Sequence, residues 1–230
     1  MEILLIWVFM LVVLWAAFKT AYRLINYKNL IHLALFLAVL SLSVNVVAEL
    51  VQQNLPQNNQ LAVQPGLVGE WTQISSVAFI LCGLTLLIRL SKPQFARFPI
   101  TFTALPLLII ATYPLAIETV MIKKWLLGIY EGGAIIAAIL IFSMKSARNR
   151  NFILLLLGSV VLSASYALYW FPILHSEFHF YWYLAFAVGL YLSVRGVDRA
   201  YPLPKNEYRD VDSIDLDSNL NASDTGLEQQ

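Results

Sequence analysis

The chain has 230 residues, of which 59% are hydrophobic and 13% are charged, and its mean hydropathy is +0.70. This composition excludes an ordinary water-soluble domain of the same size and predicts a lipid environment. The formal net charge is only +1, and no basic patch lies away from the predicted membrane edges, so nucleic-acid binding has no support.

The charged positions divide the chain into seven apolar stretches. A membrane-spanning helix needs about 20 mainly apolar residues. We therefore expect an all-α, polytopic membrane protein with helices at about 2–18, 30–50, 70–90, 99–118, 125–144, 152–171 and 177–195. The first stretch has no basic region before it and no small-residue cleavage motif after it, so we expect it to remain as a helix. The seven-helix domain would cover 1–200, followed by an acidic tail over 201–230 whose composition predicts disorder.

Basic residues occupy alternate connections between the predicted helices. They lie at Lys19 to Lys28, Arg89 to Arg97, Lys145 to Arg150 and Arg195 to Arg199, and the exception is the pair Lys123 and Lys124. Positive loops face the cytoplasm, so the N-terminus is expected outside and the C-terminus inside. A bacterial cytoplasmic membrane fits this pattern, with the lipid bilayer as the surrounding partner.

All carboxylates of residues 1–195 fall on the predicted outer side. They are Glu2, Glu49, Glu70, Glu118, Glu131 and Glu177. An ionisable group at membrane depth is costly, and it normally faces the bundle interior, a partner or a water-filled cavity. Helical periodicity places Asn45 and Glu49 on one stripe and Glu70 and Gln73 on another.

These two stripes predict a polar pocket that opens outward. Its candidate residues are Asn45, Glu49, Glu70, Gln73, Glu118 and Glu131. Glu131 is the leading candidate, because the two glycines that follow it leave space beside its side chain. Two plainer interpretations stay open: helix-end glutamates often serve only as interfacial caps, and amide side chains often join neighbouring helices.

His175 and His179 lie four residues apart at the start of the last predicted helix. This spacing puts both side chains on one helix face, where they can reach one metal ion. Zinc would need a third protein ligand, and Cys82 is the only cysteine, so that ligand would have to be a carboxylate. Alternatively, both histidines lie at the membrane interface and flank Glu177.

The segment His175-x-x-x-His179, followed by an aromatic apolar run, resembles the final-helix motif of the seven-helix zinc hydrolases, which include the alkaline ceramidases and adiponectin-receptor-like proteins. Glu70-Trp71 followed by Ser75-Ser76 is also similar to a segment of the ceramidases. The resemblance implies a zinc-dependent hydrolase. The family's other zinc histidine and its aspartate partner have no counterpart here, since no aspartate precedes Asp198.

Other motifs concern helix shape and packing. Pro99, Pro106 and Pro114 predict a kink in the fourth helix. Trp170 and Trp182, near outer ends, are typical of the membrane interface. Small residues four apart are typical of packing within a helix bundle and occur as Gly128 and Gly132, Gly133 and Ala137, Ser159 and Ser163, and Ala185 and Gly189.

The sequence carries no phosphate-binding loop, nucleophile elbow or kinase signature, which favours a protein that is not an enzyme. Retinal is not expected, because no lysine lies between Lys145 and Lys205 to form a Schiff base. No cofactor is expected, with zinc as the alternative. We expect a receptor-like or binding protein that acts through a membrane or cytoplasmic partner, contacted by the tail. The alternatives are a metal-dependent membrane hydrolase that uses His175 and His179, and an ion or proton translocator.

Overall fold

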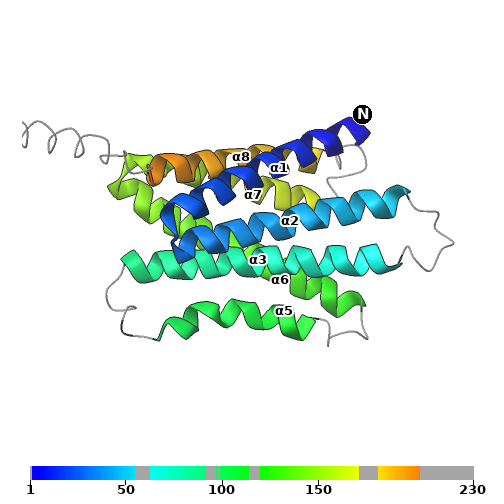
Figure 1. The fold of residues 1–230 in the computed structure, drawn as a ribbon, viewed down its shortest axis with the longest axis horizontal. Coiled ribbons are helices and arrows are strands. Elements are labelled where there is room, and N and C mark those ends of the chain that lie inside the picture. Colours follow the sequence, from blue (N-terminus) through cyan, green and yellow to red (C-terminus); the bar gives the residue numbers. More distant parts are fainter. Residues whose placement is uncertain are drawn as a thin grey trace, which may run out of the picture. The chain divides into compact units, whose positions relative to one another are not determined.

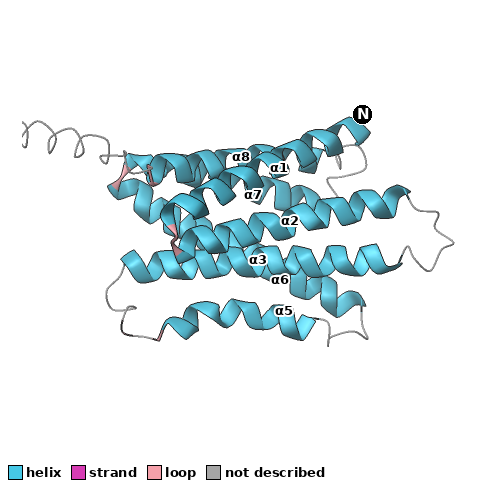
Figure 2. Cartoon of the chain, in the orientation of Figure 1, coloured by secondary structure: helices cyan, strands magenta, loops and turns pink. Residues whose placement is uncertain are grey.

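Helices account for nearly all of the described chain, and the part that the structure describes contains no strand (Figure 2). The computed structural model describes residues 2–54, 63–91, 97, 99–113, 120–170 and 181–202. Its elements are α1 (Glu2–Tyr27), α2 (Leu30–Asn54), α3 (Val63–Ser91), η2 (Ile100–Leu107), α5 (Leu108–Thr112), α6 (Val120–Arg148), η4 (Arg150–Phe152), α7 (Ile153–Trp170) and α8 (Tyr181–Ala200).

Five of these helices are long and apolar enough to cross a membrane. The apolar segments are Leu5–Tyr27, Leu30–Gln52, Val68–Leu90, Lys123–Arg148 and Arg150–Trp170. Their outer faces are apolar as well: Phe18, Ile25 and Leu90 expose 73%, 70% and 72% of their surfaces. Such faces are costly in water and well solvated by lipid tails, so these are the features of a helical membrane protein.

The long helices pack as a ring. α2 lies beside α3, α1 contacts α2 and α8, α7 contacts α8, and α6 closes the ring by contacting α7 and α3 (Figure 1). The short pair η2 and α5 packs on α3, outside this ring. Residues 1–200 form one compact unit, and 201–230 form a second. The tail that the sequence predicts to be disordered lies outside the described residues from 203 onward.

Two apolar clusters hold neighbouring helices together. The first combines Phe9 and Val13 of α1 with Val46 of α2 and Leu190 of α8. The second joins α3, α5 and α6 through Ile74, Ile109 and Leu127, with Tyr113 beside them. Many other large apolar side chains are exposed, such as Leu11, Leu105 and Ile136.

The first helix is longer than the sequence predicts, because it continues to Tyr27 rather than ending near residue 18. Lys19 and Arg23 were expected to end it. Both are instead paired with Asp198 of α8, so the two charges are accommodated within the helix. The chain then turns sharply: Lys28 adopts a φ of 46°, and the side chain of Asn29 accepts a hydrogen bond from Ile31 N at 3.2 Å, which caps α2.

The expected fourth span over 99–118 has a different form in its described part. A 3₁₀ helix, η2, contains Pro106 and is followed by the single short α-helix α5. Proline lacks the N–H that an α-helix needs at that position, so a proline-rich stretch departs from α geometry. Its apolar segment, Thr101–Thr112, is shorter than the five long ones, and Pro114 lies outside the described residues.

The last helix, predicted over 177–195, continues to Ala200, and residues 177–180 of the predicted range lie outside the described residues. α8 does not belong to the five long apolar segments, but it packs closely on α7. A Cβ added to Gly196 would lie 2.7 Å from Leu155 N, and one added to Gly158 would lie 2.9 Å from Ser193 N. Only glycine allows the two backbones to approach so closely.

Candidate functional site

A cavity of about 400 Å³ lies inside the ring, and each of the six ring helices contributes to its wall. Its polar lining comes mainly from Asn45, Glu49, Gln52, Glu70, Gln73, Ser76, Glu131, Ser159 and Ser165. Within the described part of the chain, three lining residues are carboxylates and none is lysine, arginine or histidine. The described lining therefore offers acidic groups and no basic one, and a described cation outside it, Lys123, lies 5.5 Å from the centroid of the Tyr113 ring that bonds Glu70.

α2 and α3 form one wall of the cavity. The amide Nδ2 of Asn45 donates a hydrogen bond to the Gly69 carbonyl at 2.8 Å, which ties the two helices together. One turn further along α2, Glu49 accepts a hydrogen bond from the Tyr183 hydroxyl at 3.3 Å. The i and i+4 spacing of Asn45 and Glu49 places both on the face of α2 that lines the cavity.

Glu131 of α6 is held by two neutral donors. Gln73 Nε2 donates to its Oε1 at 2.7 Å, and the Trp170 indole Nε1 donates to its Oε2 at 2.8 Å. No described lysine or arginine lies within ion-pairing distance of this carboxylate, since the ion pairs of the described chain join α1 to α8. Hydrogen bonds position Glu131, and no described lysine or arginine pairs with it.

Glu70 lies near the same end of the cavity and is more exposed. Its Oε2 accepts a long hydrogen bond, 3.3 Å, from the Tyr113 hydroxyl beyond α5. The neighbouring Trp71 Nε1 donates to the Ile110 carbonyl at 2.9 Å, so two bonds link this turn of α3 to the short helix outside the ring.

The cavity changes character along the helices. On α3 the polar residues Glu70 and Gln73 are followed by Val77 and Ile80, and on α6 Glu131 is followed by Ala134, Ile135 and Ala138. Seven residues separate Glu131 from Ala138, a helical rise of about 10 Å. The cavity is therefore acidic and polar at one end and mainly apolar toward its depth, where Ser76 and Ser159 add hydroxyl groups.

Aromatic side chains complete the wall, and sequence reasoning missed them. Phe9, Tyr166, Tyr169, Trp182 and Phe186 line the cavity. Trp170 and Trp182 were interpreted as interfacial tryptophans, yet one bonds Glu131 and the other lines the cavity. The spacing of Tyr166, Tyr169 and Trp170 on one helix face was the available signal.

The two glycines that follow Glu131 differ in the space that they leave. The Tyr166 hydroxyl lies 3.1 Å from where a Gly132 Cβ would stand and donates to the Gly128 carbonyl at 2.9 Å. Gly133 has no atom within 4 Å of that point, so it does not contribute to packing. Gly132 thus makes room for a tyrosine.

Most of the predicted pocket residues are brought together by the fold. Asn45, Glu49, Glu70, Gln73 and Glu131 all line the cavity. Glu118, His175 and His179 lie outside the described residues, so the predicted metal pair is without a structural description. Among the residues that are described, no group of three or more His, Cys, Asp or Glu side chains is arranged to hold a metal ion.

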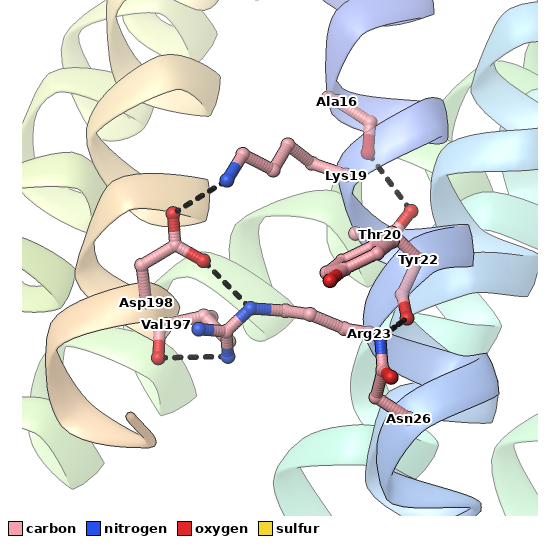
Figure 3. A network of polar contacts seen from close by, with 8 residues as sticks. All are labelled: Ala16, Lys19, Thr20, Tyr22, Arg23, Asn26, Val197 and Asp198. Atoms are coloured by element: carbon pink, nitrogen blue, oxygen red, sulfur yellow. Dashed lines mark hydrogen bonds and ion pairs between the residues drawn. The ribbon is translucent and has the colours of Figure 1, made fainter. Parts of the chain in front are cut away.

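The opposite end of the bundle carries a second set of charges (Figure 3). Arg23 Nε donates to Asp198 Oδ1 at 2.6 Å, its Nη1 donates to the Val197 carbonyl at 3.0 Å, and Lys19 Nζ lies 3.6 Å from the other Asp198 oxygen. Arg23 is 4% exposed. His32 is buried nearby and stacks on Tyr27 with a centroid separation of 4.5 Å.

Comparison of the chain with protein-family models, with curated proteins and with solved structures found no match.

Proposed function

We propose that this protein is a receptor-like or binding protein of the membrane, whose cavity takes up a ligand from outside the cell and which acts through a partner. The observation that supports this is the cavity itself: all six ring helices line it, and its described lining holds three carboxylates without a basic residue. Ligand sites are commonly concave and mostly apolar, with a few converging polar groups.

The orientation belongs to the same proposal. Seven helices would cross the membrane, with η2 and α5 taking the fourth position and α8 the seventh. The anionic lining lies toward the C-terminal end of α2 and the N-terminal ends of α3 and α6, whereas Lys19, Arg23 and Arg195 lie toward the other end of the bundle. Basic residues favour the cytoplasm, which supports an outer position for the cavity mouth and a cytoplasmic C-terminus, in a bacterial inner membrane.

The alternatives are less well supported. A translocator needs polar groups that continue toward the cytoplasmic side, and the deeper described lining is largely apolar, as Ile80, Ala138 and Leu162 illustrate. A zinc hydrolase would depend on His175 and His179, which lie outside the described residues, so no described geometry supports it.

Thiol labelling tests the position of the cavity. In a Cys82→Ala background, one cysteine is placed at Gln73 in the cavity and another, as the matched control, at Ile129, which is 67% exposed on the lipid-facing side of α6. A third replaces the exposed Arg195. The reagent is a charged, membrane-impermeant maleimide, applied to intact spheroplasts and to inverted vesicles.

We expect Gln73→Cys to react in spheroplasts, Ile129→Cys to be protected by lipid in both preparations, and Arg195→Cys to react only in inverted vesicles. Reaction of Gln73→Cys only in inverted vesicles would reverse the orientation. Failure to react in either preparation would show a cavity closed to both sides and would contradict the proposal.

A further inference from the structure

The charge of the cavity defines what can enter it. Glu49, Glu70 and Glu131 come from three different helices, and each accepts a hydrogen bond from a neutral tyrosine, amide or indole donor. Neutral donors orient a carboxylate but do not cancel its charge. An anionic site with low-dielectric walls attracts cations and repels anions. A positively charged group is therefore the expected occupant of the polar end.

The aromatic wall indicates an organic cation. Tyr169 and Trp182 pack edge to face with centroids 5.2 Å apart, and Trp182 also contacts Phe9 at 6.2 Å. Tyrosine and tryptophan rings attract ammonium groups over their faces, and cages of such rings are used to recognise substituted ammonium ions.

A small metal ion fits the same wall poorly. Metal ions need several ligands at about 2 to 2.6 Å, which requires closely converging oxygens. The described acidic side chains form no such group. Both oxygens of Glu131 are already engaged by Gln73 and Trp170. A bulky cation needs charge and aromatic contact rather than a tight coordination shell.

The apolar depth of the cavity defines the rest of the ligand. Beyond Glu131 the wall is mainly apolar: Val77, Ile80, Ile135, Leu162 and Phe186 line it, together with the hydroxyl groups of Ser76 and Ser159. A fully hydrophilic cation would leave this surface in contact with water. An alkyl or aryl group attached to the cation would cover it, and burial of that group would add to the affinity.

We infer that the cavity binds a cationic amphiphile, an amine or quaternary ammonium whose charged head lies among Glu49, Glu70 and Glu131 and whose apolar tail extends toward Ile80 and Ile135. This inference rests on the proposed binding function and names its ligand class. The head contacts the carboxylates and the Tyr169 and Trp182 rings.

Matched probes of equal tail length test the inference. Octylamine, octyltrimethylammonium, octanol and octanoate share one tail and differ in head-group charge. Binding is measured by thermal unfolding and calorimetry on the full chain in zwitterionic lipid nanodiscs, and empty nanodiscs correct for partitioning into lipid. We expect saturable binding of the two cations, weaker binding of octanol and no binding of octanoate.

Variants separate a loss of binding from a loss of folding. Glu131→Gln keeps the side-chain shape and should weaken octylamine binding by roughly tenfold or more, because a charge-assisted contact is lost. Glu49→Gln provides a second removal of charge. Tyr169→Leu should weaken octyltrimethylammonium more than octylamine. The control, Arg195→Gln, removes an exposed charge away from the cavity and should leave both affinities unchanged.

The outcomes distinguish the inferred ligand class from the proposed binding function on which it rests. Equal binding of octanol and octylamine, or full affinity in both glutamine variants, would overturn the cationic head and leave an apolar cavity. If no probe binds while Gln73→Cys still reacts from outside, the ligand class is wrong and the outward cavity stands. If no probe binds and Gln73→Cys is unreactive, both proposals fail.

Discussion

The two ends of the helix bundle treat buried charge in opposite ways. At the basic end, Asp198 is bonded to Arg23 at 2.6 Å and lies 3.6 Å from Lys19, so each charge has a partner. At the polar end, Glu131 is held by an amide and an indole, with no basic residue in the described cavity lining. A compensated charge stabilises the bundle, whereas an uncompensated one attracts a cation from elsewhere. The same residue class thus supports structure at one end and proposed binding at the other.

The largest expected effect comes from breaking the compensated pair. Replacing Arg23 by Met leaves the carboxylate of Asp198 without its closest partner and should lower the free energy of unfolding by about 3 kcal/mol. The measurement is reversible unfolding of the full chain in mixed micelles. Removing both charges, with Asp198→Asn added, should recover part of the loss. A double variant as unstable as the single one would argue against the ion pair as the cause.

The next largest effect is expected from a substitution at the basic end that changes no charged residue. Gly196→Ala puts a Cβ 2.7 Å from Leu155 N, and the α7 and α8 backbones must separate, at a cost of about 1 to 3 kcal/mol. Gly133→Ala is the matched control, since nothing lies within 4 Å of its Cβ position, and alanine there should be neutral or slightly stabilising. Thermal unfolding of both variants checks the pair. Equal destabilisation would mean that close packing is not the reason for glycine at 196.

A smaller effect is expected from neutralising the polar end. Glu131→Gln keeps the bond from Gln73 but turns an N–H toward the Trp170 indole, so one hydrogen bond of about 1 kcal/mol is lost. The relief of an unpaired buried charge acts in the opposite direction. We expect the free energy of unfolding to change by about 1 kcal/mol or less. If Glu131→Gln lowered the free energy of unfolding as much as Arg23→Met, Glu131 would be a structural residue. The two ends of the bundle would then not differ in the role of their carboxyl groups.

The smallest effect concerns the long hydrogen bonds to the other two glutamates. Tyr183→Phe and Tyr113→Phe each remove a bond of 3.3 Å, which is weak by its length. Each should change the free energy of unfolding by about 0.5 kcal/mol. Unfolding curves that overlay the wild type within that margin are the expected result. A much larger loss in either variant would mean that its glutamate is anchored as firmly as Asp198.

The cavity was predictable from sequence to the extent that helical periodicity determines it. Spacing put Asn45 beside Glu49 and Glu70 near Gln73, and both pairs line the cavity. Tyr166, Tyr169 and Trp182 escaped notice because aromatic residues near helix ends are also typical of the membrane interface. Local pattern does not distinguish the two environments. Only the packing of the six helices places these aromatic side chains on the cavity wall.

The basic end was not predictable by the same means. Lys19 and Arg23 look like the end of a membrane helix, and their partner is separated from Arg23 by 175 positions. The spacing of residues within one helix does not predict a contact between two helices that lie so far apart in the sequence. The prolines did predict an irregular fourth segment. Proline content alone, however, does not distinguish a kinked α-helix from the 3₁₀ helix η2.

The bond between Arg23 and Asp198 also bears on how the protein is made. During synthesis α1 is made first and α8 last. Arg23 therefore cannot pair with Asp198 until nearly the whole bundle has left the ribosome. α8 is the less apolar helix of its pair, and it fits closely against α7. A nascent chain that stops short of position 198 would leave both Lys19 and Arg23 without the Asp198 carboxylate. Completion of the last helix therefore supplies the contact that joins the end of α1 to the end of α8.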